Sequence, residues 1–256
     1  MHWADYTAQR LMERGDEQVS ASGITPSGEF HIGHLREILS AEMIHRACLD
    51  AGMSSKYIFI VDSMDPLRRV YDFLSPEYEE FIGCPLAYIP APDEDGSPGD
   101  GSVTYADHFL SPFLDSLEQI GVRPEVVMNH ETYERGLFAE YIDSAITNRE
   151  EIRSIIQQIS GRELPHDWFP YNPMGSGGSM DGVTVTGYEK PYVVWRDSSG
   201  NEGKSDIRKA HGKMPWRVDW AARWVIHGIT CEPAGKDHGA SGLSLIHISE
   251  PTRRST

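Results

Sequence analysis

A predicted strand, a tight turn and a helix start follow one another directly near the beginning of this chain. The run Gln18–Ile24 is typical of a short buried strand, and Thr25-Pro26-Ser27-Gly28 is typical of a turn. An apolar-periodic pattern then predicts a helix that begins at His31. The backbone N–H groups of a helix that starts behind a strand and a turn form a ready site for phosphate.

Two histidines one helical turn apart, in the run His31-Ile32-Gly33-His34, strengthen this prediction. Both can hydrogen-bond a triphosphate and the charge that develops on it during group transfer. Gly33 has no side chain where a flat purine would approach the backbone. The alternative interpretation is a pair of helix-capping or core histidines. The whole pattern favours an enzyme that activates a substrate with ATP, with His31 and His34 as catalytic residues and with nucleotide contacts from Thr25, Pro26, Ser27, Gly28, His31, Gly33 and His34.

Periodicity along the rest of the chain predicts an α/β protein with a Rossmann-type parallel sheet and a helical, loop-rich insertion. Further strands are expected at 56–61, 125–128 and 229–231, and helices at 6–15, 31–52, 105–119, 134–159 (broken near Asn148) and 217–226. Residues 165–212 are rich in Pro, Gly, Ser and Asp, with short β-type pieces at 182–186 and 192–196. We therefore expect a catalytic domain in two parts, 1–164 and 213–242, separated by a small loop and β insertion at 165–212, and a tail at 243–256.

Composition limits the class of protein and its surroundings. A length of 256 residues with 39% hydrophobic content allows one large or two small domains with a real core. The net charge of −16 argues against a broad basic surface that grips nucleic acid unaided. Three cysteines without paired spacing indicate a reducing compartment and no zinc knuckle. With no apolar run of membrane-spanning length and a polar, acidic N-terminus, we expect a cytoplasmic protein without a membrane partner.

Several further motifs accompany the histidines in order between residues 1 and 242. His31-Ile-Gly-His34 is literally the signature of class I aminoacyl-tRNA synthetases, and the other motifs resemble the class I lysyl-tRNA synthetases. They are Gly23-Ile-Thr-Pro-Ser-Gly28, Asp65-Pro-Leu-Arg-Arg69, Thr104-Tyr-Ala-Asp-His-Phe109, Pro215-Trp-Arg-Val-Asp-Trp-Ala-Ala-Arg-Trp224 and Glu232-Pro-Ala-Gly-Lys-Asp-His238. The Trp-rich and Gly-Lys-Asp-His runs make the resemblance to the lysyl family specific.

This resemblance implies the ligation of L-lysine to tRNA(Lys), with ATP as substrate and Mg²⁺ assisting. It also implies that Gly23 and Thr25 contact lysine, that Asp237 lies near the ribose or the amino acid, and that His238 lies in the lysine pocket.

The side chain of lysine has an apolar stem and a cationic head, which a tryptophan face and a carboxylate would suit. We therefore assign Trp216 and Trp220 to an aromatic wall and Asp219 to the ε-ammonium, although the same spacing also fits a core stripe, the interpretation we prefer for Trp224. Asp62 and Asp65 follow a buried strand and either cap the next loop or take part in the site.

The chain departs from the family pattern in three ways. The second class I signature, Lys-Met-Ser-Lys-Ser, and the anticodon-binding domain have no counterpart, so we interpret the chain as an amino-terminal fragment. No cysteine lies between Cys84 and Cys231, which removes the zinc knuckles of some relatives. The tail after Gly242 resembles a translated sequencing adaptor. Two alternatives stay open: a nucleotidylyltransferase of the His-x-Gly-His type, and a non-catalytic protein that binds an amino acid or RNA.

Overall fold

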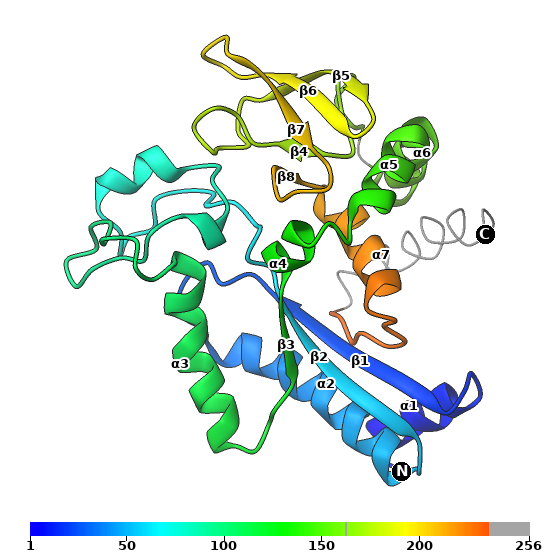
Figure 1. Cartoon of the computed structure of the whole chain (residues 1–256). Coiled ribbons are helices and arrows are strands. Elements are labelled where there is room, and N and C mark those ends of the chain that lie inside the picture. The colour runs from blue at the N-terminus through cyan, green and yellow to red at the C-terminus, as the bar shows by residue number, and fades with distance from the viewer. Residues whose placement is uncertain (162, 236–256) are drawn as a thin grey trace.

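The computed structural model describes residues 1–161 and 163–235, and its first half is built on a parallel sheet (Figure 1). Strands β1 (Glu17–Ile24), β2 (Ser54–Val61) and β3 (Glu125–Met128) lie in the order β1-β2-β3. Helices α1 (Trp3–Met12), α2 (Ile32–Asp50) and α3 (Tyr105–Gln119) accompany the sheet. Ile38 of α2, Phe59 of β2 and Phe113 of α3 share one core, which we call the sheet core. The expected α/β class with a Rossmann-type parallel sheet is confirmed.

Burial of β2 explains why it is a central strand. Its last five residues, Tyr57 to Val61, are all buried, as expected for a strand covered on both faces. Because β1 and β2 are parallel and Ile24 lies opposite Val61, Thr25 and Asp62 leave the sheet at the same edge. In open α/β sheets this carboxyl edge is where ligands bind.

The second half of the chain forms another core around helices and antiparallel strands. Helices α4 (Asn129–Glu134), α5 (Ala139–Thr147), α6 (Arg149–Ser160) and α7 (Trp216–Ile226) surround it. Strands β5 (Thr184–Glu189), β6 (Tyr192–Arg196) and β7 (Glu202–Asp206) form an antiparallel sheet, and β4 (Asn172–Pro173) pairs with β8 (Gly212–Lys213). Phe138, Val193 and Trp220 pack together in this second core, which we call the helical core.

Most of the expected elements are confirmed, and residues 105–119 and 125–128 carry the predicted helix and strand without a shift at either end. The predicted strand at 229–231 is wrong. Cys231 forms only an isolated parallel bridge to Ser20, with the Ala21 N–H donating to the Cys231 carbonyl at 2.8 Å. Gly228 in the left-handed region, with φ 63°, and Pro233, which lacks an N–H, leave too short a run for a strand.

Helix α1 begins and ends three residues before the helix predicted at 6–15. Further differences lie in the helical core. The predicted helix at 134–159 is shorter at its beginning, because residues 135–138 form a turn between α4 and α5, but the break near Asn148 is confirmed. Strand β7 was not expected, because Glu202-Gly-Lys-Ser-Asp206 has no strand-like composition and forms its ladder only by pairing with β6. Two short 3₁₀ helices, η1 (Pro76–Phe81) and η2 (Leu86–Tyr88), complete the described part of the chain.

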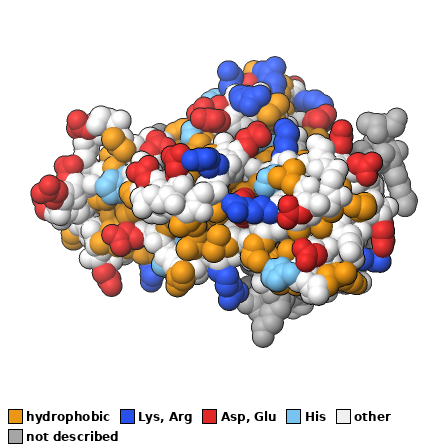
Figure 2. Space-filling view, turned by 90° about the horizontal axis from the view of Figure 1, so that it is seen from below, with side chains coloured by type: hydrophobic (Ala, Val, Ile, Leu, Met, Phe, Trp, Pro, Cys, Tyr) orange, Lys and Arg blue, Asp and Glu red, His pale blue; other side chains and the backbone are white. Residues whose placement is uncertain are grey.

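Charged residues on the face below the sheet are mixed in sign. Figure 2 shows acidic and basic side chains interspersed with apolar ones over this face, without one sign dominating it. No helix in the described residues is both long enough and apolar enough to cross a membrane.

Candidate active site

A cavity of about 220 Å³, which we call the inner cavity, opens at the carboxyl edge of β1 and β2 and reaches α7. Both cores contribute to it, since the strand ends come from the sheet core and α7 from the helical core. Its lining residues are Ser22, Gly23, Thr25, Glu37, Asp62, Asp65, Arg68, Lys213, Trp216, Asp219, Trp220, Arg223, Glu232, Pro233, Ala234 and Gly235.

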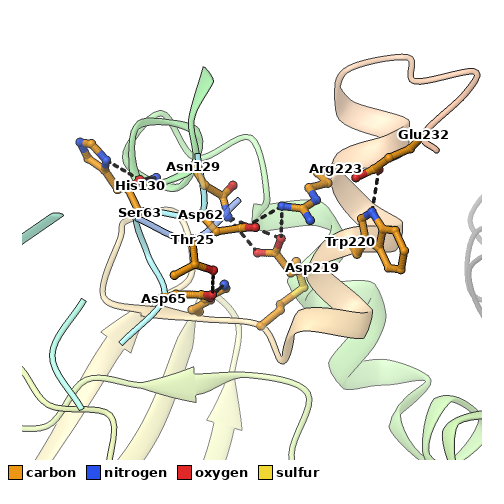
Figure 3. A network of polar contacts seen from close by, with 12 residues as sticks. Thr25, Asp62, Ser63, Asp65, Asn129, His130, Asp219, Trp220, Arg223 and Glu232 are labelled. Atoms are coloured by element: carbon orange, nitrogen blue, oxygen red, sulfur yellow. Dashed lines mark hydrogen bonds and ion pairs between the residues drawn. The ribbon is translucent and has the colours of Figure 1, made fainter. Parts of the chain in front are cut away.

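Two buried ion pairs hold the strand ends against the second half of the chain, and Figure 3 shows the one between Asp62 and Arg223. Arg223 Nη1 lies 2.6 Å from Asp62 Oδ1, and the Lys213 ammonium bonds Asp65. The Thr25 hydroxyl donates to the other oxygen of Asp65 at 2.6 Å. Burial alone would raise the pKa of Asp65, but the charge and hydrogen bond of Lys213 and the hydrogen bond of Thr25 hold it below its usual value.

Lys213 stays protonated for a related reason. Burial by itself lowers the pKa of its ammonium, but the carboxylates of Asp65, Asp219 and Asp62 raise it above the usual value. Asp62 and Asp65 are therefore ion-pair partners in the wall of the cavity, and a part for either of them in ligand binding stays a prediction.

Asp219 lies in the wall of the inner cavity with only 1% of its surface exposed. The Tyr133 hydroxyl donates to Asp219 Oδ2 at 2.5 Å, and the Asn129 side-chain amide approaches the same oxygen at 3.3 Å. Arg223 Nη1 is 4.0 Å from Asp219 Oδ1. Sequence reasoning missed Tyr133 and Asn129, because nothing local links them to a residue about ninety positions away.

The position of Gly23 is explained by the guanidinium beside it. A Cβ at residue 23 would lie 3.2 Å from Arg223 Nη2 and 3.6 Å from Asp62 Oδ2. A side chain here would crowd the Arg223–Asp62 pair. Glycine lets the backbone of β1 approach that pair closely.

Trp216 and Trp220 of α7 line the cavity, but Trp220 also packs in the helical core, so cavity lining and core packing coincide at this residue. Trp216, 41% exposed, and Trp220, 6% exposed, line the cavity with ring centroids 5.5 Å apart. Trp224 is partly buried against the helical core. The Nε1–H groups of Trp220 and Trp224 both donate to Glu232 Oε2, at 2.7 and 2.5 Å. Glu232 thereby ties the segment after α7 to the aromatic wall.

A second, wider cavity of about 960 Å³, which we call the outer cavity, lies on the other side of the turn at 25–28. His31 and His34 lie in its wall with their ring centroids 4.0 Å apart. The other lining residues are Ser27, Gly28, Glu29, Tyr71, Phe73, Pro92, Asp93, Glu94, Asp95, Gly96, His108 and Phe109.

Hydrogen bonds at the start of α2 define the tautomer of both histidines. The Gly33 N–H donates to His31 Nδ1 at 3.0 Å, and the His31 N–H donates to His34 Nδ1 at 3.1 Å. Because Nδ1 is the acceptor in each neutral ring, the proton is on Nε2, which can donate to a ligand. Burial and the neighbouring His31 lower the pKa of His34, which favours this neutral form. Helix capping and phosphate binding are therefore compatible roles for the same side chains.

The structure gives a steric reason for glycine at position 33, which the sequence did not indicate. A Cβ at residue 33 would lie 2.7 Å from His31 Cε1 and 2.9 Å from its Nδ1. Any larger residue must therefore displace the His31 ring. Whether a purine also approaches Gly33 stays a prediction.

The predicted site residues are thus divided between two adjacent cavities. Gly23, Thr25, Trp216, Asp219 and Trp220 line the inner cavity. The outer cavity takes Ser27, Gly28, His31 and His34, while Pro26 is buried in the turn between them. Asp237 and His238 lie outside the described residues.

Comparison with known proteins gives the family. The sequence model described as "tRNA synthetases class I (K)" matches residues 1–252. The chain belongs to this family. It is 42% identical to the lysine–tRNA ligase of Picrophilus torridus over 245 residues, which is 95% of this chain and 47% of that protein. It is 43% identical to the lysine–tRNA ligase of Archaeoglobus fulgidus, covering 95% of this chain and 48% of that protein.

The chain spans about half the length of these curated relatives. Among solved structures, the tryptophanyl-tRNA synthetase of Plasmodium falciparum matches 97% of this chain and 49% of its own, with a TM-score of 0.46 and 12% sequence identity.

Metal-ligating side chains do not gather among the described residues of this site. Over residues 1–161 and 163–235, no three His, Cys, Asp or Glu side chains form a group that could hold a metal ion. The Mg²⁺ that the family resemblance implies stays a prediction.

Proposed function

We propose that this chain forms the lysine- and ATP-binding part of a class I lysine–tRNA ligase. The observation that carries the proposal is the pair of adjacent cavities at one sheet edge. The inner one has room for an amino acid, and the wider outer one has two Nε2–H donors at a helix N-terminus. The family membership and the names of the relatives support this assignment.

Charge in the inner cavity favours an amine-bearing ligand. Five carboxylates, Glu37, Asp62, Asp65, Asp219 and Glu232, face three cations, Arg68, Lys213 and Arg223. This excess of negative charge suits lysine, which carries two ammonium groups and one carboxylate. The faces of Trp216 and Trp220 suit its apolar stem, and Asp219 is the carboxylate we assign to the ε-ammonium.

In the proposed first step, the lysine carboxylate attacks the α-phosphate of ATP in line. The bond to pyrophosphate breaks, and lysyl-adenylate forms. His31 and His34 donate from Nε2 to phosphate oxygens as negative charge develops there, and the dipole of α2, whose N-terminus lies beside them, adds its own field. Neither histidine has to form a covalent bond, so catalysis here is positioning and electrostatic stabilisation.

In the second step, a terminal ribose hydroxyl of tRNA(Lys) attacks the acyl carbon of lysyl-adenylate, and AMP leaves. Because the chain carries a net charge of −16, we propose that the tRNA contacts of this half are local. We place the reaction in the cytoplasm, in keeping with three cysteines that are all free thiols.

Two measurements test this proposal. In calorimetry on this chain, lysine and ATP are expected to bind, with other amino acids weaker than lysine. In a protein extended to the relatives' length, ATP–pyrophosphate exchange is expected with lysine and not with the other amino acids. There His34→Ala should lower kcat, by about 100-fold, more than it raises KM.

The alternatives predict different results. A nucleotidylyltransferase would show no amino-acid-dependent exchange. A non-catalytic amino-acid binder would bind lysine without forming adenylate. Unchanged turnover in His34→Ala would remove the catalytic role of that residue.

A further inference from the structure

Tyr133 of α4 connects two walls of the inner cavity although it does not line the cavity itself. Its hydroxyl donates to Asp219 Oδ2 at 2.5 Å and accepts from the Met214 N–H at 3.1 Å. Asp219 belongs to α7, and Met214 directly follows Lys213, the partner of Asp65. One hydroxyl thus bonds two of the segments that present charge to the cavity.

The Tyr133 hydroxyl donates one hydrogen bond and accepts another, and the two roles cannot be exchanged. A phenol has one hydrogen to donate, and Tyr133 gives it to Asp219, so a lone pair is left for Met214. Burial, together with the nearby carboxylate of Asp219, raises the pKa of Tyr133 well above its usual value, so the hydroxyl remains a donor at any pH at which the protein works. The ring is 1% exposed and stacks on Phe138 with centroids 4.1 Å apart, which leaves it little freedom to turn.

From this geometry we infer that Tyr133 is a positioning residue for lysine recognition, acting through Asp219 and the backbone next to Lys213. The inference rests on the proposed function. Without the hydroxyl, the buried Met214 N–H loses its acceptor and Asp219 loses its shortest hydrogen bond. The carboxylate is then free to turn away from the place where an ammonium would meet it.

The chain supplies a matched control for this inference. Tyr171 is also fully buried in the helical core, but its hydroxyl has no hydrogen-bond partner within the described structure. Tyr133→Phe and Tyr171→Phe therefore remove the same atom from the same core. Only the first substitution breaks a connection to the cavity.

The test measures the dissociation constants of lysine and ATP for the 256-residue chain and both variants, well below their melting temperatures. Tyr133→Phe is expected to weaken lysine binding by about tenfold and to leave ATP binding unchanged, since the outer cavity is separate. Tyr171→Phe is expected to change neither constant. In a double-mutant cycle, Tyr133→Phe should have a smaller effect in an Asp219→Asn background than in the original chain.

Each other outcome overturns the inference. Equal lysine affinity in Tyr133→Phe would show that the hydroxyl positions nothing, and a parallel loss of lysine and ATP affinity would show a general structural role. If Tyr133→Phe does not fold, Asn129→Ser removes the other donor to the same oxygen of Asp219. Unchanged lysine affinity in that variant would show that hydrogen bonds to Asp219 do not position it for lysine, which overturns the inference. A parent chain that binds ATP but not lysine would overturn the proposed substrate together with this inference. If the parent chain does bind lysine, failure of the Tyr133→Phe prediction overturns this inference alone.

Discussion

The absence of a side chain at Gly33 allows the His31 ring to lie where it does in the wall of the outer cavity. In Gly33→Ala the new Cβ would lie 2.7 Å from His31 Cε1, so the ring has to leave its place at the start of α2. We expect ATP to bind about tenfold more weakly, the value of one charge-assisted hydrogen bond. Stability should change by less than about 1 kcal/mol, because alanine favours the helix while the cap is weakened.

The measurements for Gly33→Ala are calorimetry with ATP and urea unfolding. Gly177→Ala is the matched control, because a Cβ there meets nothing within 4 Å and the backbone is outside the left-handed region. It should leave ATP affinity and stability unchanged. Full ATP affinity in Gly33→Ala would mean that the His31 ring position seen here is not the one that binds phosphate.

Single residues also show where sequence reasoning succeeds. His31, His34 and the turn before them are local in sequence, so their spacing alone predicts a helix start, and the structure places that start in the wall of the outer cavity. The ion pairs of Asp62 and Asp65 join positions about 150 residues apart, and Tyr133 lies 86 residues from Asp219. No periodicity encodes such contacts, because they depend on how the second half of the chain folds back onto the first.

At the scale of elements, the end of β2 and helix α7 are joined by buried charge. The guanidinium of Arg223 and the carboxylate of Asp62 each have less than 15% of their side-chain surface exposed. Removing one partner leaves the other charge buried and unpaired, so Arg223→Met should lower the free energy of unfolding by about 3–5 kcal/mol. The double variant Asp62→Leu/Arg223→Met should recover much of this loss.

Urea unfolding of the two single variants and the double variant checks this prediction. The exposed pair of Arg196 and Glu202 is the control, because both side chains are more than half exposed. Arg196→Met should cost less than about 1 kcal/mol. A double variant as unstable as the sum of its single variants would show that the Asp62–Arg223 contact contributes no coupling between β2 and α7.

The missed strand β7 and the wrongly predicted strand at 229–231 have a common property. Strand β7 is polar and acquires its conformation from β6, and residues 229–231 meet β1 through a single bridge. Strand β2 and helix α3, by contrast, carry their own apolar patterns and lie where periodicity predicts them. Elements defined by their own buried face can be predicted from sequence, whereas elements defined by a neighbouring strand cannot.

At the scale of the whole molecule, the inner cavity is lined by residues from both the sheet-core and the helical-core parts of the chain. The ligand assigned to it would contact Gly23 and Thr25 of one half and Asp219 and Trp220 of the other. Lysine should therefore stabilise both halves together. A ligand at 100 times its dissociation constant adds about 2.7 kcal/mol to the free energy of unfolding of whatever unit it binds.

Urea unfolding with two probes tests this expectation. Five of the six tryptophans lie between residues 168 and 224, so their fluorescence reports mainly on the helical core, whereas far-ultraviolet circular dichroism reports on both cores. With saturating lysine both transitions should move to higher urea by the same amount. Norleucine has the same stem without the ε-ammonium and should move neither. If only the fluorescence transition moved, the sheet core would unfold independently, and lysine would be held by the helical core alone.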